Sequence, residues 1–244
     1  MKQIEQKTRL ETEDQIKTNF SISNLSLMVV NKSKSGLALF LSVLNLFSPA
    51  ANFTEKHTKV HSGIITESVT FIENKGQVRD QNHECRPDVL FSGMANGMVY
   101  HLRNNGISYQ LTNRKDNQSN IYRVDLNWMN VNKNIIIQTE GVLKGFDNYY
   151  TGSVPVLNVK SYSGVIYKNI YNNIDLHYYA KEGQLKYDFI VAPNSDYKQI
   201  KLRVDGAEHI TMQRDGSLIL RTPMGDISEG TPLVYQNGKK IEAH

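Results

Sequence analysis

Short apolar stretches separated by turn residues follow one another along the chain after Asn52, and this spacing limits the possible folds more than any other feature. The stretches are rich in Val, Ile, Tyr and Phe, and Gly, Asn and Asp interrupt them. Runs of this length and spacing are typical of antiparallel sandwiches and barrels. No segment after Asn52 holds a long apolar stripe with helical period. We therefore expect an all-β fold, an antiparallel β-sandwich of many short, hairpin-linked strands.

Two hairpins are the clearest. One joins Met98–Arg103 to Ile107–Leu111 through Asn104-Asn105-Gly106, where Asn and Gly accept the positive φ angles of a tight turn. The other joins Ile174–Ala180 to Gln184–Val191. Alternation within the second hairpin predicts a buried face and a face toward solvent or a cleft. The buried set is Ile174, Leu176, Tyr178, Leu185, Tyr187, Phe189 and Val191. The opposite set is Asp175, His177, Lys186 and Asp188.

The N-terminal region has the pattern of an export signal. Leu37–Phe47 is an uncharged apolar run, preceded by Lys32 and Lys34 and followed by the small residues Ser48-Pro49-Ala50-Ala51. This pattern predicts a secretory signal peptide, here a helix, with cleavage after Ala50. The run is too short to span a bilayer, which needs about 20 apolar residues. A buried core helix is the alternative.

The chain is expected to divide into four parts. Residues 1–27 are a non-native or disordered extension, since Met28 stands where an ordinary signal peptide would begin. Residues 28–51 form the signal peptide and residues 52–68 a flexible linker. Residues 69–244 form the β-sandwich domain. This domain is expected to be truncated at its C-terminal end, because a returning strand has barely begun after Asn237-Gly238.

Charge and cysteine content exclude some classes of protein. The net charge is +4, and the Lys and Arg residues after residue 51 are scattered singly among acids. A nucleic-acid interface needs clustered Lys and Arg, so no nucleic-acid partner is expected. Cys85 is the one cysteine, which excludes an intramolecular disulfide.

Four residues are candidates for ligand binding. Asp175 and His177 share one face of a strand, and Asp188 lies on the expected partner strand. Cross-strand geometry would bring these side chains within about 5–8 Å of one another. Tyr179 lies on the same face and, opposite in phase to Tyr178, is expected to be exposed. A site for sugar or metal is one interpretation, and the solvated side of a half-buried sheet is the other. An Asp-x-His pair lacks the three ligands of a catalytic zinc, so we expect neither a metal nor a cofactor.

No motif predicts a catalytic residue. The sequence has no GxSxG elbow, no phosphate-binding loop and no HExxH motif. The polar stretch Glu73-Asn74-Lys75-Gly76-Gln77 directly follows an apolar strand. Asn and Gly are ordinary turn residues, so a role in fixing the turn is favoured over a role in binding.

Several phrases occur in an order that resembles a known family. They are Phe71–Gln77 (FIENKGQ), Pro87–Phe91, Asn105–Tyr109, Asn148–Gly152, Tyr167–Leu176, Leu185–Pro193, Asp215–Leu218 and Pro232–Gln236. Together they are similar to the N-terminal domain of uncharacterised function that precedes SBBP (β-propeller-type) repeats in large secreted or cell-surface proteins of Bacteroidetes and other bacteria. The resemblance implies an extracellular location, often reached by type IX secretion. It brings no established catalytic or ligand-binding residues.

Two functions are expected. The first is a non-catalytic, extracellular structural or interaction module of a larger bacterial surface or secreted protein. Its partners would be its own downstream repeats or another cell-surface protein or glycan, with no stable membrane span. The alternative is a carbohydrate-binding or carbohydrate-processing domain that uses the Asp175, His177 and Tyr179 face.

Overall fold

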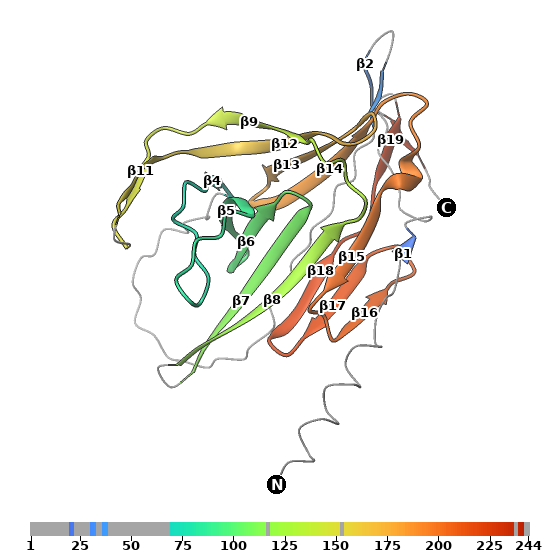
Figure 1. The fold of residues 1–244 in the computed structure, drawn as a ribbon. Helices are drawn as coiled ribbons and strands as arrows, with labels where there is room; N and C mark the ends of the chain where they lie inside the picture. Colours follow the sequence, from blue (N-terminus) through green and yellow to red (C-terminus); the bar gives the residue numbers. More distant parts are fainter. Residues whose placement is uncertain are drawn as a thin grey trace, which may run out of the picture.

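The computed structural model describes residues 69–115, 118–151, 154–236 and 239–241. It also describes the backbone of three short N-terminal strands, β1 (Phe20–Ser21), β2 (Val30–Lys32) and β3 (Gly36–Ala38). The expected extension, signal-peptide helix and linker lie almost wholly outside the described residues and stay predictions. The described part is all β, apart from the 3-10 turn η1 (Tyr197–Gln199) (Figure 1). The predicted fold class is therefore confirmed.

Most strands belong to one large antiparallel sheet of 11 strands within the described part of the chain. Its order is β1-β15-β8-β7-β6-β5-β4-β12-β13-β14, and β9 pairs with β12 beside this path. The bounds of these strands after β1 are β4 (Phe71–Glu73), β5 (Val89–Ala95), β6 (Met98–Arg103), β7 (Gly106–Lys115), β8 (Gln118–Trp128), β9 (Ile136–Val142), β12 (Ser161–Tyr171), β13 (Ile174–Lys181), β14 (Gln184–Val191) and β15 (Lys201–Asp205).

Strand β12 makes the sheet curl. Its first two residues pair with β4, and its later residues pair with β13 and, on the other edge, with β9. The layer β9-β12-β13-β14 thus lies over the layer formed by β5 to β8 and β15 (Figure 1). The sandwich expected from the sequence is one sheet folded over on itself.

Four small sheets complete the described part of the fold, and β2 and β3 form one of them. Strands β16 (His209–Met212), β17 (Leu218–Thr222) and β18 (Gly225–Glu229) form another, and it contributes the buried residues Leu220 and Ile227 to the core. Strands β10 (Asp147–Tyr149) and β11 (Val156–Val159) form an arm that projects beyond β9 and β12 (Figure 1). Strands β19 (Val234–Gln236) and β20 (Lys239–Ile241) pair across the turn predicted at Asn237-Gly238.

The two predicted hairpins are present. Tyr100 pairs with Tyr109 across the β6–β7 hairpin, and Tyr178 pairs with Tyr187 across the β13–β14 hairpin. The seven residues predicted to be buried in the second hairpin are all 4% exposed or less. The predicted strand phase is therefore right.

Tyrosines build much of the core, and their hydroxyl groups are hydrogen-bonded. Burying a hydroxyl group without a partner costs about 1–3 kcal/mol, so each buried ring needs an acceptor or donor nearby. Tyr100 donates to the Thr70 carbonyl at 2.7 Å, Tyr167 to the Arg103 carbonyl at 3.0 Å, and Tyr171 to the Met129 carbonyl at 3.0 Å. Tyr178 accepts from the Trp128 indole N–H at 3.0 Å. Many of the tyrosines are therefore core residues, with their rings buried and their hydroxyl groups hydrogen-bonded.

Candidate functional site

The candidate residues lie on the outward surface of β9, β12, β13 and β14, which we term the outer face. Strand register arranges its side chains in rows across the four strands. One row is Glu140, Gly164, Tyr179 and Lys186, and the next is Gln138, Ile166, His177 and Asp188. The structure thus brings His177, Tyr179 and Asp188 together, as their spacing predicted.

The carboxylate of Asp175 on β13 is bound by groups of the neighbouring strand β12. Its carboxylate accepts a hydrogen bond from the backbone N–H of Asn169 at 2.7 Å and pairs with the ammonium of Lys168. Both partners belong to β12, so Asp175 fastens β12 to β13. A structural role accounts for this residue.

His177 contacts an acid that the sequence did not suggest. Its Nε2 atom lies 2.9 Å from Oε2 of Glu140 on β9. Its ring also lies against Tyr179, with centroids 5.0 Å apart and planes at 34°. Burial lowers the pKa of His177, and Glu140 opposes this shift. Glu140 was missed because nothing in local sequence links β9 to β13, which lie two strands apart in the sheet.

Glycine opens the surface between these groups. A side chain at Gly164 on β12 would begin 3.1 Å from both Glu140 Oε2 and His177 Nε2. Such contacts are tight for a Cβ atom, and any larger side chain would displace the pair. The glycine therefore keeps the Glu140–His177 contact possible.

The predicted solvent or cleft exposure of Asp188 is wrong. Its position is on the outer face, but the residue is only 4% exposed. The Tyr179 side chain hydrogen-bonds it, and this places a large ring beside the short carboxylate. Burial raises the pKa of Asp188 to about 7. Its Oδ1 atom has no hydrogen-bond partner among the described residues. Tyr179, expected to be exposed, is correspondingly half-buried.

No metal centre emerges from these groups. Within the described ranges, no three His, Cys, Asp or Glu side chains lie close enough together to hold a metal ion. In the same part of the chain, no helix is long and apolar enough to cross a membrane.

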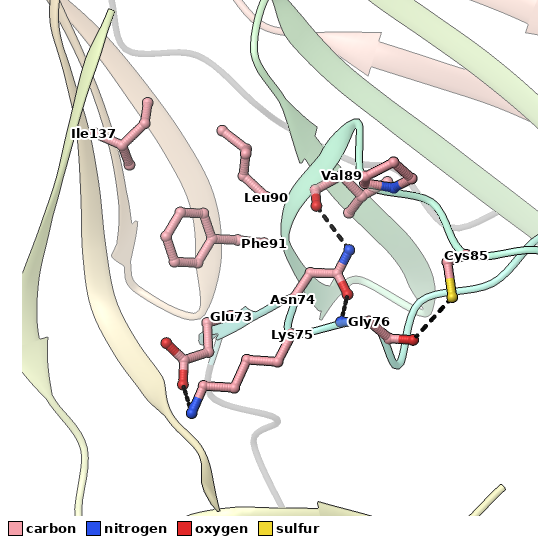
Figure 2. Close-up of a pocket in the computed structure, with 10 residues that line it drawn as sticks. Glu73, Asn74, Lys75, Gly76, Cys85, Val89, Leu90, Phe91 and Ile137 are labelled. Atoms are coloured by element: carbon pink, nitrogen blue, oxygen red, sulfur yellow. Dashed lines mark hydrogen bonds and ion pairs between the residues drawn. The ribbon is translucent and has the colours of Figure 1, made fainter. Parts of the chain in front are cut away.

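A cavity of about 560 Å³ lies between β9, the start of β5 and the turn after β4. Figure 2 shows Ile137 of β9 on one side and Leu90 and Phe91 of β5 on the other. Val89 and Pro87 extend the apolar wall, and Glu73, Lys75 and Cys85 lie at its polar part. The size suits a small ligand or a single large side chain.

The turn beside this cavity is fixed by Asn74. Its side-chain amide donates to the carbonyls of Arg86 and Val89, both at 2.8 Å. Its side-chain oxygen accepts from the backbone N–H group of Gly76 at 2.9 Å (Figure 2). The same oxygen accepts from the backbone N–H group of Val78 at 3.2 Å. Gly76 has φ +110°, which other residues rarely adopt. The structure thus shows the turn-fixing role that was favoured for this stretch.

The polar groups around the cavity are engaged with one another. Glu73 accepts from the backbone N–H of Lys160 at 2.9 Å and lies 3.3 Å from the Lys75 ammonium. Lys75 also donates to the Asn158 carbonyl at 2.9 Å. Cys85 is exposed, and its Sγ lies 3.7 Å from the Gly76 carbonyl. A reactive thiolate needs a nearby base or positive field, and the Gly76 carbonyl supplies neither. The cavity is therefore better suited to binding an apolar group than to catalysing a reaction.

The geometry defines a class of protein, a single curled antiparallel sheet with a polar and aromatic outer face and an apolar cavity under one edge. The family comparison agrees with the boundaries of this fold. Residues 71–244 match the family DUF7948, a domain of unknown function, and the chain belongs to that family. Neither the curated proteins nor the solved structures contain a match to this chain.

Proposed function

We propose that this chain is a non-catalytic, extracellular interaction module of a larger bacterial surface or secreted protein. The observation that carries the proposal is a concentration of exposed apolar side chains on β9, the β10–β11 arm and their flanks. Exposure of these residues ranges from 46% to 71%, and they are Ile136, Val142, Phe146, Tyr150, Val154 and Leu157. Exposed apolar clusters on a folded domain mark surfaces that bind other macromolecules.

The contacts of Asp175 and Glu73 support a role without catalysis for these two acids. Asp175 is held by Lys168 and Asn169, and Glu73 by Lys160 and Lys75. A general acid or base must reach the proton that it transfers. These carboxylates instead form hydrogen bonds and ion pairs that hold neighbouring strands together. We further propose that the module precedes SBBP repeats and is exported by a Bacteroidetes-type route, as its resemblance implies.

An antibody against the folded domain tests this proposal. On blots of the source cells, it should detect a product larger than the 244-residue chain. External protease added to intact cells should degrade that product, because the module would lie outside the cell. A product no longer than the chain, protected until the cells are lysed, would contradict the proposal.

The second candidate function is carbohydrate binding by the outer face. Two observations favour it. The rings of His177 and Tyr179 lie together on the outer face, and the exposed carboxylate of Glu140 lies beside His177. Sugars bind by stacking on rings and by donating hydroxyl groups to carboxylate oxygens.

A glycan array on the purified chain tests this second function. If a glycan binds there, Tyr179→Ala should weaken its binding at least 10-fold, because the stacking ring is lost. Glu140→Gln should weaken binding while keeping the side-chain shape, because it removes the exposed carboxylate of this face. Tyr150→Ala is the matched control, since Tyr150 is 70% exposed on the distant arm. Equal loss in Tyr179→Ala and Tyr150→Ala would place the glycan elsewhere.

A further inference from the structure

The cavity beside the turn after β4 combines an apolar wall with one pair of charged groups. Leu90 and Phe91 of β5 and Ile137 of β9 belong to the wall. The carboxylate of Glu73 and the ammonium of Lys75 lie against each other at the same cavity (Figure 2). Its volume of about 560 Å³ is within the range of small-molecule sites, which are mostly apolar with a few placed polar groups.

The Glu73 carboxylate is held in place and stays ionised. Its Oε1 atom accepts from the backbone N–H of Lys160 at 2.9 Å and lies 3.3 Å from Nζ of Lys75. Burial raises the pKa of Glu73, but the hydrogen bonds from Lys160 and Lys75 outweigh it and hold the pKa below the usual 4.5. The cavity therefore has a fixed negative group and a positive group in contact.

Both charged groups keep hydrogen-bonding capacity for a ligand. A carboxylate oxygen can accept two hydrogen bonds, and Oε2 of Glu73 accepts one among the described residues, from the Tyr162 hydroxyl at 3.3 Å. An ammonium has three N–H donors. The partners of Lys75 among the described residues are Glu73 and the Asn158 carbonyl, at 2.9 Å from Nζ. One acceptor position and one donor therefore remain beside the apolar wall.

We propose that this cavity binds a neutral small molecule that joins an apolar ring system or branched chain to one amide or hydroxyl group. The apolar part would lie against Leu90, Phe91 and Ile137. An amide carbonyl would accept from Lys75, and the amide N–H would donate to Glu73. The polar end should be neutral, because either charge would lie close to a like charge of the Glu73–Lys75 pair. This function goes beyond the interaction role proposed above.

Isothermal titration calorimetry of the full chain with 2-naphthamide tests the inference. We expect a dissociation constant on the order of 100 μM, a modest affinity for a ligand of this size. The acid 2-naphthoate has the same rings and a charged end, and it should bind about 5-fold more weakly. N,N-dimethyl-2-naphthamide lacks the N–H that would donate to Glu73, and a similar loss is expected. No binding of 2-naphthamide at about 1 mM, or equal affinities of the three compounds, would overturn the inference.

Cys85 reports whether the ligand occupies this cavity. It is the one cysteine of the chain, it is exposed, and it lines the cavity. Saturating 2-naphthamide should slow the reaction of its thiol with dithiobis(nitrobenzoate) about 5-fold, because little unoccupied cavity remains at saturation. The absorbance of the released thionitrobenzoate measures this rate in the unchanged protein. A rate that 2-naphthamide leaves unaltered would overturn the inference, since the compound would then bind elsewhere.

A pair of lysine variants tests the polar contact. Lys75→Met removes the ammonium but keeps a side chain of similar length, and it should weaken 2-naphthamide binding about 5-fold. Lys144→Met is the matched control, since Lys144 is exposed on the loop after β9 and is not among the residues that line the cavity. Equal affinities of the two variants would overturn the inference. Such a result would leave the export and length test of the proposed function unaffected.

Discussion

Replacing Trp128 by alanine is expected to lower the free energy of unfolding by about 3–5 kcal/mol. Trp128 is 2% exposed and joins the two layers of the curled sheet. Its ring makes edge-on contacts with Phe189 and Tyr187, with centroids 4.8 Å and 5.5 Å apart. Its indole N–H donates to the Tyr178 hydroxyl at 3.0 Å. The alanine variant loses the packing and leaves a cavity, and it also removes the donor to Tyr178.

Urea unfolding followed by far-UV circular dichroism measures this loss. Dichroism is the suitable probe because Trp128 is the one tryptophan, so the variant has no indole fluorescence. Trp128→Phe should cost less, since it keeps a ring between the layers. Phe146→Ala removes an aromatic ring that is 59% exposed, and it should change stability by no more than about 0.5 kcal/mol. Similar losses in the Trp128→Ala and Phe146→Ala variants would mean that the layers do not depend on this contact.

The sequence predicted those parts of the fold that depend on neighbouring residues. Alternation in β13 and β14 was enough to place Tyr178, Tyr187 and Phe189 in the core, because a strand exposes alternate residues to opposite faces. Asn and Gly residues were enough to place the hairpin turns. A turn and its two strands are consecutive, so their geometry is encoded locally.

The parts that were missed depend on strands far apart in the chain. Alternation gives the face on which Asp188 lies but not what covers that face, so the burial of Asp188 beside Tyr179 was unforeseen. Glu140 reaches His177 only because β9 and β13 both flank β12. Glu229 of β18 contacts Tyr109 of β7, 120 residues earlier in the chain. No local pattern predicts a contact at that separation.

This buried Glu229 leads to the second large expected effect, on the pH dependence of stability. Glu229 is 4% exposed, and the hydroxyl groups of Tyr109 and Tyr187 donate to its two oxygens at 3.4 Å and 3.3 Å. Burial raises its pKa from the usual 4.5 to about 8, and the two tyrosines and Lys186 offset only part of this shift. The folded protein therefore keeps a proton on Glu229 at pH values where the unfolded chain has lost it.

The sign of the effect follows from this difference in bound protons. Below about pH 4 both states hold the proton, and the contribution of Glu229 to stability is complete. As the pH rises from about 4.5 to about 8, only the unfolded chain releases the proton, so stability falls. The total loss from this one group is on the order of 4 kcal/mol. Asp188, with its pKa raised to about 7, acts in the same direction.

Glu229→Gln should remove this pH dependence while keeping the fold. Glutamine has the same shape, stays neutral, and still offers an oxygen to a tyrosine hydroxyl group. The variant should resemble the original chain near pH 4 and become the more stable of the two as the pH approaches 8. Urea unfolding at pH 4, 5, 6, 7 and 8 measures the difference.

His101 and His177, whose pKa values burial lowers, add an opposing slope below about pH 6.5, but this slope is common to both proteins and cancels. Asp188→Asn should remove a separate part of the slope, which ends near pH 7 rather than pH 8. If the stability curves of the original chain and Glu229→Gln run parallel from pH 4 to pH 8, then Glu229 does not hold its proton in the folded core. Lys186 or solvent would then have to stabilise its charge.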